Sequence, residues 1–333
     1  MPHFAAFTLV KTDSTREAVV ETIKTYVDAA EAAGVGTVLE TLTWRASPDW
    51  AKKLGYSEDD LAAAIKDSVD ATHEACKTYV DKGGVVVISG CVGPRGDGYM
   101  ADSNMTAAEA QEYHSTLVNH LAASRAVDMI SAMTITYPEE AIGIALAAQA
   151  AGLPAVISFT TETDGRLPSG HTLKEVIELV DSKAPKAVAY FVVNCAHPTH
   201  FEQALEEGAS RGEAWVGRIR GVKVNASTKS HAELDDCEEL DSGDPEDLGR
   251  RVAVLRKRHP CLRVVSGCCG TDERHLKAIS AACKYTDLDG STSRAPAGPD
   301  RPFVRWTKRL SRFRALPWTM CMRAAKLCSP RTG

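Results

Sequence analysis

Seven apolar runs rich in β-branched residues recur along the chain, and segments with helical periodicity lie between them. Several runs are apolar without strict alternation, which is expected of strands that are covered on both faces. The intervening segments look amphipathic: Val19, Ile23 and Val27 share one helical face, and Gly34 suits a helix end. Repeated strand-then-helix units predict an α/β fold with a parallel sheet. The runs cover residues 35–44, 84–94, 127–136, 153–161, 187–195, 219–227 and 262–269.

The number of these units favours a barrel with one place unfilled. A closed (β/α)8 TIM barrel has eight strands, whereas seven βα units are visible and a helix-like segment precedes them, so the first strand is missing from the pattern. An open doubly wound sheet is the alternative, but its GxGxxG signature is absent, and the glycines of residues 93–98 do not fit it. Seven strands would leave an open seam of unpaired backbone groups, which predicts association into a homo-oligomer.

Charge divides the chain into two parts. Residues 290–333 carry ten Lys and Arg and one acid, Asp300, while the rest of the chain carries 29 basic and 43 acidic side chains. We therefore predict a barrel domain over residues 1–285 and a basic, disordered tail over residues 286–333. The acidic body predicts that nucleic acid is not a partner, because nucleic-acid binding needs basic surfaces.

The chain shows no export or membrane signal. No run approaches the roughly 18 apolar residues of a membrane span, and the opening MPHFAAFTLVKTD has no basic start followed by a long apolar region. These features predict a cytoplasmic location. In that reducing compartment the ten cysteines are expected to bind metal or do chemistry rather than to form structural disulfides.

Polar and glycine residues collect where six of the apolar runs end. The segments read TWRASPDW, GCVGPRGDGY, ETDGRLPSGH, NCAHPTH, NASTKSH and GCCGTDE. In a parallel barrel these loops share one rim, and active sites are built there. For any single loop the alternative is a polar surface without function.

Two adjacent cysteines, Cys268 and Cys269, stand in one of these segments. Three interpretations compete: a strained disulfide between neighbours, two unrelated core cysteines, or a metal site. Neighbouring side chains of a strand point to opposite faces, so the pair can share an ion only if the backbone turns, which Gly267 and Gly270 permit. Thr271 then looks like the capping hydroxyl of a helix.

A metal site needs further ligands, because zinc takes three protein ligands at catalytic sites and four at structural ones. Cys195, in VVNCAHPTH, ends another predicted strand and would reach the pair only through the fold. His197 and His200 are alternative ligands, although they more simply begin the next helix. Among the other cysteines, Cys76 is expected in the core, and Cys91 lies on the rim without an assigned role.

Two segments, VVNCAHPTHF and SGCCGTDERHLKAI, resemble the cysteine motifs of the homocysteine S-methyltransferase family, and the similarity runs from about residue 4 to 284. VGPRGDGY and VNAS also stand where that family has glycine- and asparagine-bearing loops. The resemblance implies a zinc-containing (β/α)8 barrel. It further implies that the zinc ligands are Cys195, Cys268 and Cys269. The substrate-binding residues that it implies are Asn194, Asn225, Gly93 and Glu162.

The chain departs from the family in two places. The family's first strand ends in an Asp-Gly-Gly-type motif, and no such motif precedes the first apolar run here. The family also often has a glutamate in the strand that here reads SAMTIT, where Met133 stands; Glu139 and Glu140 follow farther on. Neither departure touches the three cysteines, but both concern the groups that would hold the ammonium group of homocysteine.

The ligand type suggests the reaction. A free thiol is mostly protonated at neutral pH, and zinc binding deprotonates it. Three thiolate ligands weaken the Lewis acidity of Zn²⁺, whereas a hydrolase needs an acidic metal-bound water. The sequence therefore predicts a zinc-dependent methyltransferase whose small-molecule substrates are homocysteine and a methyl donor, with the substrate thiolate as the nucleophile.

Three other functions are compatible with the same residues. The first is a zinc or redox protein without methyl transfer, in which Cys268 and Cys269 form a reversible disulfide. The second is a lyase or aldolase that uses the rim acids Asp97, Glu162 and Asp164. The third is a barrel that has lost catalysis and binds a partner.

Overall fold

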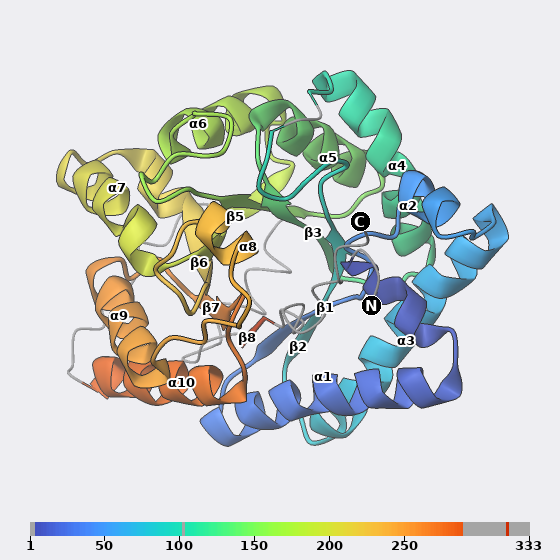
Figure 1. Cartoon of the computed structure of the whole chain (residues 1–333), viewed down its shortest axis with the longest axis horizontal. Coiled ribbons are helices and arrows are strands. Elements are labelled where there is room, and N and C mark those ends of the chain that lie inside the picture. The colour runs from blue at the N-terminus through green and yellow to red at the C-terminus, as the bar shows by residue number, and fades with distance from the viewer. Residues whose placement is uncertain (1–3, 102–103, 289–317, 320–333) are drawn as a thin grey trace.

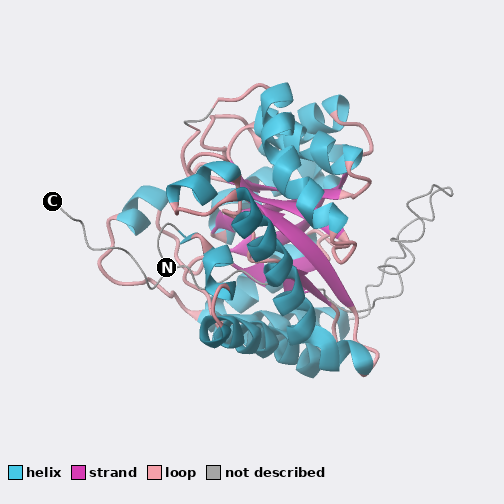
Figure 2. Cartoon of the chain, turned by 90° about the vertical axis from the view of Figure 1, so that its right-hand side faces the viewer, coloured by secondary structure: helices cyan, strands magenta, loops and turns pink. Residues whose placement is uncertain are grey.

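The computed structural model describes residues 4–101, 104–288 and 318–319 of the 333-residue chain. Parallel strands form a central ring, and helices surround it (Figure 1). A side view shows the strands enclosed between helices (Figure 2). The seven strands that the sequence predicted are β1 (Thr37–Glu40), β2 (Val86–Val92), β3 (Met129–Ile135), β4 (Ala155–Thr160), β5 (Val188–Ala196), β6 (Ile219–Val224) and β7 (Val264–Gly267).

The connecting helices begin at the caps that the sequence provides. Thr106 and Thr172, for example, accept a hydrogen bond from the backbone N–H three residues on, and the carboxylate of the glutamate at that position accepts one from the N–H of the cap residue. The helical elements are η2 (Ala6–Val10), α1 (Asp13–Ala33), α2 (Pro48–Lys53), α3 (Glu58–Asp81), α4 (Ala107–Ala123), α5 (Pro138–Ala150), α6 (Leu173–Lys183), α7 (Pro198–Ser210), η3 (Ala214–Arg218), α8 (His231–Asp235), α9 (Pro245–Arg258) and α10 (Glu273–Leu288).

The predicted seven βα units are confirmed, and the ring is closed. Each strand from β1 to β7 pairs in parallel with the next along the chain. Within the described residues no strand precedes α1, which agrees with the missing first strand. The open doubly wound sheet is excluded by the closed order of the strands.

The expected open seam is wrong. A two-residue strand, β8 (Trp318–Thr319), lies between β7 and β1 and pairs in parallel with both. Its register joins Trp318 to Thr37 on one side and to Val265 on the other. The strand comes from the segment that the sequence analysis treated as a tail, so that segment contributes backbone to the barrel. Apart from β8 and the end of α10, the predicted tail lies outside the described residues, and its disorder stays a prediction.

Alternating side chains divide the core into two shells. Outward-facing residues such as Leu39, Ile130 and Phe191 join the main core beneath the helices. Inward-facing Val38 and Met129 belong to a small cluster inside the ring. The next inward layer toward the carboxyl ends of the strands is polar and buried, and consists of Glu40, Ser89, Ser131, Ser158, Lys223 and Ser266. The interior of the barrel is therefore apolar at its base and charged in its middle.

No helix in the described part of the chain is long and apolar enough to cross a bilayer.

Candidate metal centre

Cys195 reaches the mouth of the barrel because β5 is irregular at its end. In a regular strand, Asn194 and Cys195 would point to opposite faces. The pairing of β5 with β6 shifts by one residue between Asn194 and Ala196, and Cys195 adopts the left-handed conformation with φ 52°. This local turn brings the Cys195 thiol to the same rim as the buried Asn194 amide.

Cys268 and Cys269 follow β7 in a turn that neighbouring backbone fixes. The Cys268 N–H donates to the carbonyl of Val224 at 2.7 Å, and the Cys269 N–H donates to Asn225 Oδ1 at 3.1 Å. Gly270 has φ 78°, and a Cβ there would lie 2.6 Å from the Asp241 carbonyl oxygen. The turn therefore requires glycine at position 270, which explains one of the two flanking glycines.

The helix after the cysteines begins differently from the prediction. The Thr271 hydroxyl donates to the Cys268 carbonyl at 2.7 Å instead of capping α10. Asp272 takes that role, because its Oδ1 accepts the backbone N–H of Arg274 at 2.9 Å. Thr271 thus stabilises the cysteine turn itself, and Asp272 stabilises the start of α10.

The three thiols form one cluster. The sulfur atoms of Cys195, Cys268 and Cys269 all lie within 4.8 Å of one another, and those of Cys195 and Cys269 are 3.9 Å apart. Four sulfurs around tetrahedral zinc at about 2.3 Å would be about 3.8 Å apart. None of the three cysteines is in a disulfide, so the adjacent pair is not bonded to itself in this structure. The donor set and its spacing fit a zinc ion with one position left open.

Tyr99 covers the cluster, and the sequence analysis did not single it out. Its hydroxyl lies 3.4 Å from Cys269 Sγ and 3.7 Å from Cys195 Sγ. Burial and the three neighbouring thiols raise the pKa of Tyr99 well above its ordinary value, so the phenol stays protonated and can donate. Contacts with Cys195, Cys268 and Tyr99 hold the pKa of Cys269 well below the usual thiol range.

The two predicted asparagines hold the loops that carry the thiols. Asn194 Oδ1 accepts from the Ser158 hydroxyl at 2.6 Å and from the Thr134 N–H at 3.1 Å, while its Nδ2 donates to Thr134 Oγ1. Both amides are buried. Asn194 ties the end of β5, beside Cys195, to Thr134 and Ser158, and Asn225 holds the backbone of Cys269.

Gly93 lies against a tryptophan of another rim loop. Its N–H donates to the Trp44 carbonyl at 2.9 Å, and a Cβ at this position would clash with that carbonyl and with the indole. The Trp44 indole N–H in turn donates to the Met133 carbonyl. Gly93 thus allows the loops after β1 and β2 to meet beside β3.

Glu162 contacts a histidine that the sequence analysis did not name. Glu162 Oε1 lies 3.0 Å from Nδ1 of His231, and Nε2 of His231 lies 2.7 Å from the carbonyl oxygen of Cys195. The same imidazole packs against the Tyr99 ring, with 4.3 Å between centroids. The sequence signal was the rim position of GCVGPRGDGY and NASTKSH, which contain Tyr99 and His231.

The alternative histidine ligands lie outside the thiol cluster. His197 Nδ1 faces the Thr199 hydroxyl at 2.8 Å and caps α7, and burial lowers the pKa of His197 to about 4. His200 Nε2 lies 2.9 Å from the Thr228 carbonyl oxygen. The simpler interpretation, that both histidines begin a helix, agrees with these contacts.

The remaining candidates have structural partners. Asp97 and Asp164 each accept a backbone N–H two residues on, which is how acids shape loops. Glu140 is buried and accepts from His114 at 2.9 Å and from the Arg95 N–H. These contacts do not favour a lyase site built on the rim acids.

The two other cysteines considered from the sequence are buried. Cys76, on α3, lies in the hydrophobic core, and burial raises the pKa of its thiol to about 11. The Cys91 backbone is held by Thr41 and Thr43, whose side chains contact its N–H and its carbonyl. Cys76 therefore belongs to the core, as expected.

Comparisons with known proteins agree with this geometry. Residues 4–283 match the family model described as homocysteine S-methyltransferase. Solved structures of the homocysteine methyltransferase MmuM from Escherichia coli share the fold at 21% identity. The oxidized form has a TM-score of 0.66 and the metallated form 0.64, each covering 82% of this chain and 86% of the other. No curated protein sequence gave a significant match.

Proposed function

The chain belongs to the homocysteine S-methyltransferase family, a family of zinc-dependent methyltransferases, and from this premise we propose that it transfers a methyl group to the thiol of homocysteine to form methionine. The observation that carries the proposal is the cluster of three thiols, none of them in a disulfide, from the ends of two strands. Cys195, Cys268 and Cys269 would hold the zinc ion, and the acceptor thiol would take the open fourth position.

The donor set favours alkyl transfer to sulfur over hydrolysis. When bound, zinc would deprotonate the acceptor thiol at neutral pH and keep it in place. Three thiolate ligands over-neutralise Zn²⁺, so a water on the same site would stay a poor nucleophile, unlike water on neutral histidine ligands. In the transfer, a bond forms between the acceptor sulfur and the methyl carbon. The bond between that carbon and the donor heteroatom breaks, and its electron pair leaves with the donor.

The protein residues would orient the acceptor and exclude water. The Tyr99 hydroxyl donates toward the cysteine sulfurs and closes one side of the site. Asn194 and Asn225, which fix the backbone near the cysteines, and Gly93, which lies against the Trp44 loop, would border the acceptor. Glu162 would act through His231 rather than on the substrate. A reducing compartment such as the cytoplasm would keep the three thiols reduced.

Metal analysis tests the proposal first. We expect about one zinc per chain, with most of it lost in Cys195→Ser and in Cys269→Ser. Cys261→Ser is the matched control, because this half-buried thiol faces the Val216 carbonyl and lies outside the cluster. Full zinc occupancy in both site variants would show that the ligands are misassigned.

The acceptor is tested separately from the metal. X-ray absorption of the zinc-loaded protein should show a fourth sulfur ligand when homocysteine is added. Methyl transfer to homocysteine from a panel of sulfonium and ammonium donors should then identify the donor. An unchanged coordination shell at saturating homocysteine would exclude it as the acceptor and leave the redox alternative, which thiol titration with and without zinc would examine.

A further inference from the structure

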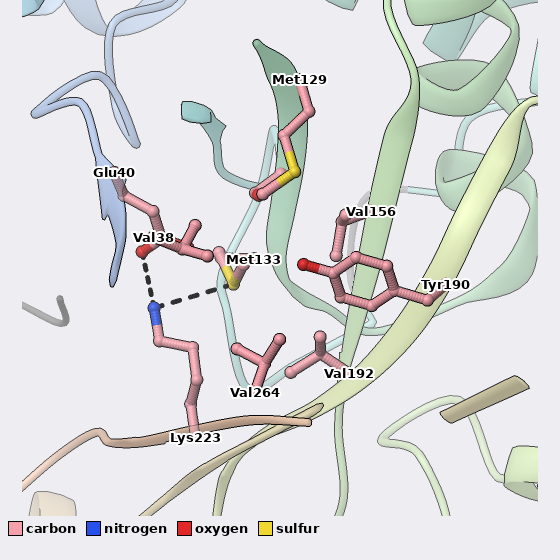
Figure 3. Close-up of a pocket in the computed structure, with 10 residues that line it drawn as sticks. Val38, Glu40, Met129, Met133, Val156, Tyr190, Val192, Lys223 and Val264 are labelled. Carbon is pink, nitrogen blue, oxygen red and sulfur yellow. Dashed lines mark hydrogen bonds and ion pairs between the residues drawn. The ribbon is translucent and has the colours of Figure 1, made fainter. Parts of the chain in front are cut away.

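A charge pair is buried in the middle of the barrel. The Lys223 ammonium lies 2.5 Å from Glu40 Oε2 and 3.9 Å from the sulfur of Met133. Both charged side chains are less than a tenth exposed. Figure 3 shows the Lys223 nitrogen between the Glu40 carboxylate and the Met133 sulfur. Ion pairs at this depth seldom add stability over an apolar pair, so a role in binding deserves a test.

The pair lies one layer of side chains below the thiols. Lys223 precedes Asn225 by two residues in the chain, and Asn225 holds the Cys269 backbone. Side chains two residues apart on a strand share a face and lie about 6.6 Å apart along it. Met133 directly precedes Thr134, which is bound to Asn194. The chain of homocysteine between its sulfur and its charged groups spans about 5 Å, which is of the order of one such layer.

The two oxygens of Glu40 differ in their hydrogen bonds to the described residues. Oε2 faces Lys223, while Oε1 is buried and has no hydrogen-bond partner among the described residues. Burial raises the pKa of the Glu40 carboxyl, and Lys223 opposes that rise. A buried acceptor without a donor is costly, and such groups often mark the place of a ligand.

A cavity lies beside the pair. Its lining includes Glu40, Lys223 and Met133 on one side and Tyr190 and Val156 on the other. The Tyr190 hydroxyl points into this space (Figure 3). Among the described residues, the space beside the charged pair is about 10 Å³, which is room for one water-sized group, such as an ammonium group, next to Glu40.

We propose that Glu40 and Lys223 bind the charged amino-acid end of the thiol acceptor. The acceptor ammonium donates to Glu40 Oε1, and the acceptor carboxylate lies against the Lys223 ammonium. This inference rests on the proposed function, because it needs the acceptor sulfur to lie among the three thiols. It makes the enzyme selective for an α-amino-acid thiol even though Met133 stands where the family often has a glutamate.

Calorimetry on the zinc-loaded protein tests the selectivity without relying on turnover. Homocysteine is compared with its desamino analogue, which lacks the ammonium group, and with its descarboxy analogue, which lacks the carboxylate. Each analogue should bind the wild-type protein at least about tenfold more weakly, as expected for the loss of a hydrogen bond to a charged group.

The double variant Glu40→Gln/Lys223→Met tests the two residues together. The double variant keeps the volume of the pair. It also leaves no unpaired buried charge, whereas either single variant would leave one. We expect the double variant to retain zinc and to bind homocysteine and its two analogues with affinities within about threefold of one another. Ser131→Ala, which changes an uncharged residue of the same cavity, should keep the wild-type ranking.

The outcomes separate the inference from the proposed function. If the wild-type protein binds homocysteine and its two analogues equally well, the assignment of Glu40 and Lys223 is wrong, while thiol binding at zinc stands. The same holds if the double variant keeps the wild-type ranking of the three ligands. If the zinc-loaded protein binds none of the thiols, the proposed function fails, and the inference fails with it.

Discussion

At the residue scale, two left-handed residues shape the site. Thr134 has φ 65° and Cys195 has φ 52°, and each stands at a shift in strand pairing. Such a conformation costs about 1–3 kcal/mol for a residue other than glycine. Asn194 offsets part of this cost, because its side chain bonds both the N–H and the hydroxyl of Thr134. The strained residues thus lie beside the thiols, and their backbone conformation sets the direction of the side chains there.

Tyr99→Phe should weaken zinc binding without abolishing it. The change removes a hydroxyl that contacts Cys269 and Cys195, and a lost donor to a thiolate makes that thiolate a poorer ligand at neutral pH. We expect a loss of about 3- to 30-fold in zinc affinity, measured by competition with a chelator. The control is Tyr113→Phe, which removes the hydroxyl of a tyrosine that lies away from the thiols. Equal affinity in Tyr99→Phe and wild type would show that the phenol serves only as a cover.

Asp272→Asn should remove a pH-dependent part of the stability. Hydrogen bonds from Arg274 and His275 hold the pKa of Asp272 well below its ordinary value. Because the folded-state pKa is the lower one, this stabilisation is present above the unfolded pKa of about 4 and is lost as the pH falls below it. We expect Asp272→Asn to lower stability by about 1–2 kcal/mol at neutral pH and to differ less from wild type near pH 3.

Denaturant unfolding at several pH values measures this difference. Glu273→Gln is the control, because Glu273 is the next residue and its side chain is about half exposed, near Lys277. A constant difference between Asp272→Asn and wild type across the acid range would contradict the assignment.

At the scale of elements, the short helix α8 holds the end of β5. His231, the first residue of α8, contacts the carbonyl oxygen of Cys195, and Glu162 from the loop after β4 faces the other ring nitrogen. Both ring nitrogens face acceptor oxygens, so the imidazole is fixed in one orientation. Three rim loops therefore meet at the strained residue that carries one of the thiols.

His231→Phe should lower zinc affinity by about 10- to 100-fold, the usual effect of removing a group that orients a ligand. Phenylalanine keeps a ring against Tyr99 but cannot donate to the Cys195 carbonyl. The matched control is His200→Phe, which removes a similar contact to the Thr228 carbonyl away from the thiols. Chelator competition gives the affinity, and circular dichroism checks the fold. An unaltered affinity in His231→Phe would mean that β5 holds Cys195 without α8.

At the scale of the whole molecule, β8 decides whether the ring is closed. It pairs with β1 at Thr37 and Val38 and with β7 at Val265. Without β8, the facing edges of β1 and β7 would expose backbone N–H and carbonyl groups, which recruit other chains. The homo-oligomer predicted from the sequence would then depend on this segment.

A chain shortened after Leu288 should therefore melt a few degrees lower and self-associate. The loss of two residues of pairing is worth about 1–2 kcal/mol, which corresponds to about 1–3 °C in a protein of this size. Differential scanning calorimetry and size-exclusion chromatography compare the shortened and full chains, with zinc content as a check on the site. A shortened chain that is monodisperse and equally stable would show that β8 adds nothing to closure.

The sequence by itself determined the elements and the chemistry. The period of its apolar residues predicted seven strands and their helices, because burial on both faces leaves that pattern. The order of strand and helix predicted a parallel ring, and these features are local, so local sequence is enough to specify them. The meeting of Cys195 with Cys268 and Cys269 was implied instead by the resemblance of their motifs to a known family.

Only the tertiary structure decided the contacts between distant segments. The pairing of β8 with β1, the Tyr99 hydroxyl over the thiols, and the bond between His231 and the Cys195 carbonyl join residues that are far apart in the chain. The same holds for Glu40 and Lys223, which are 183 positions apart. No periodicity marks such pairs, because their meeting follows from the closure of the ring and from the strained turn at Cys195.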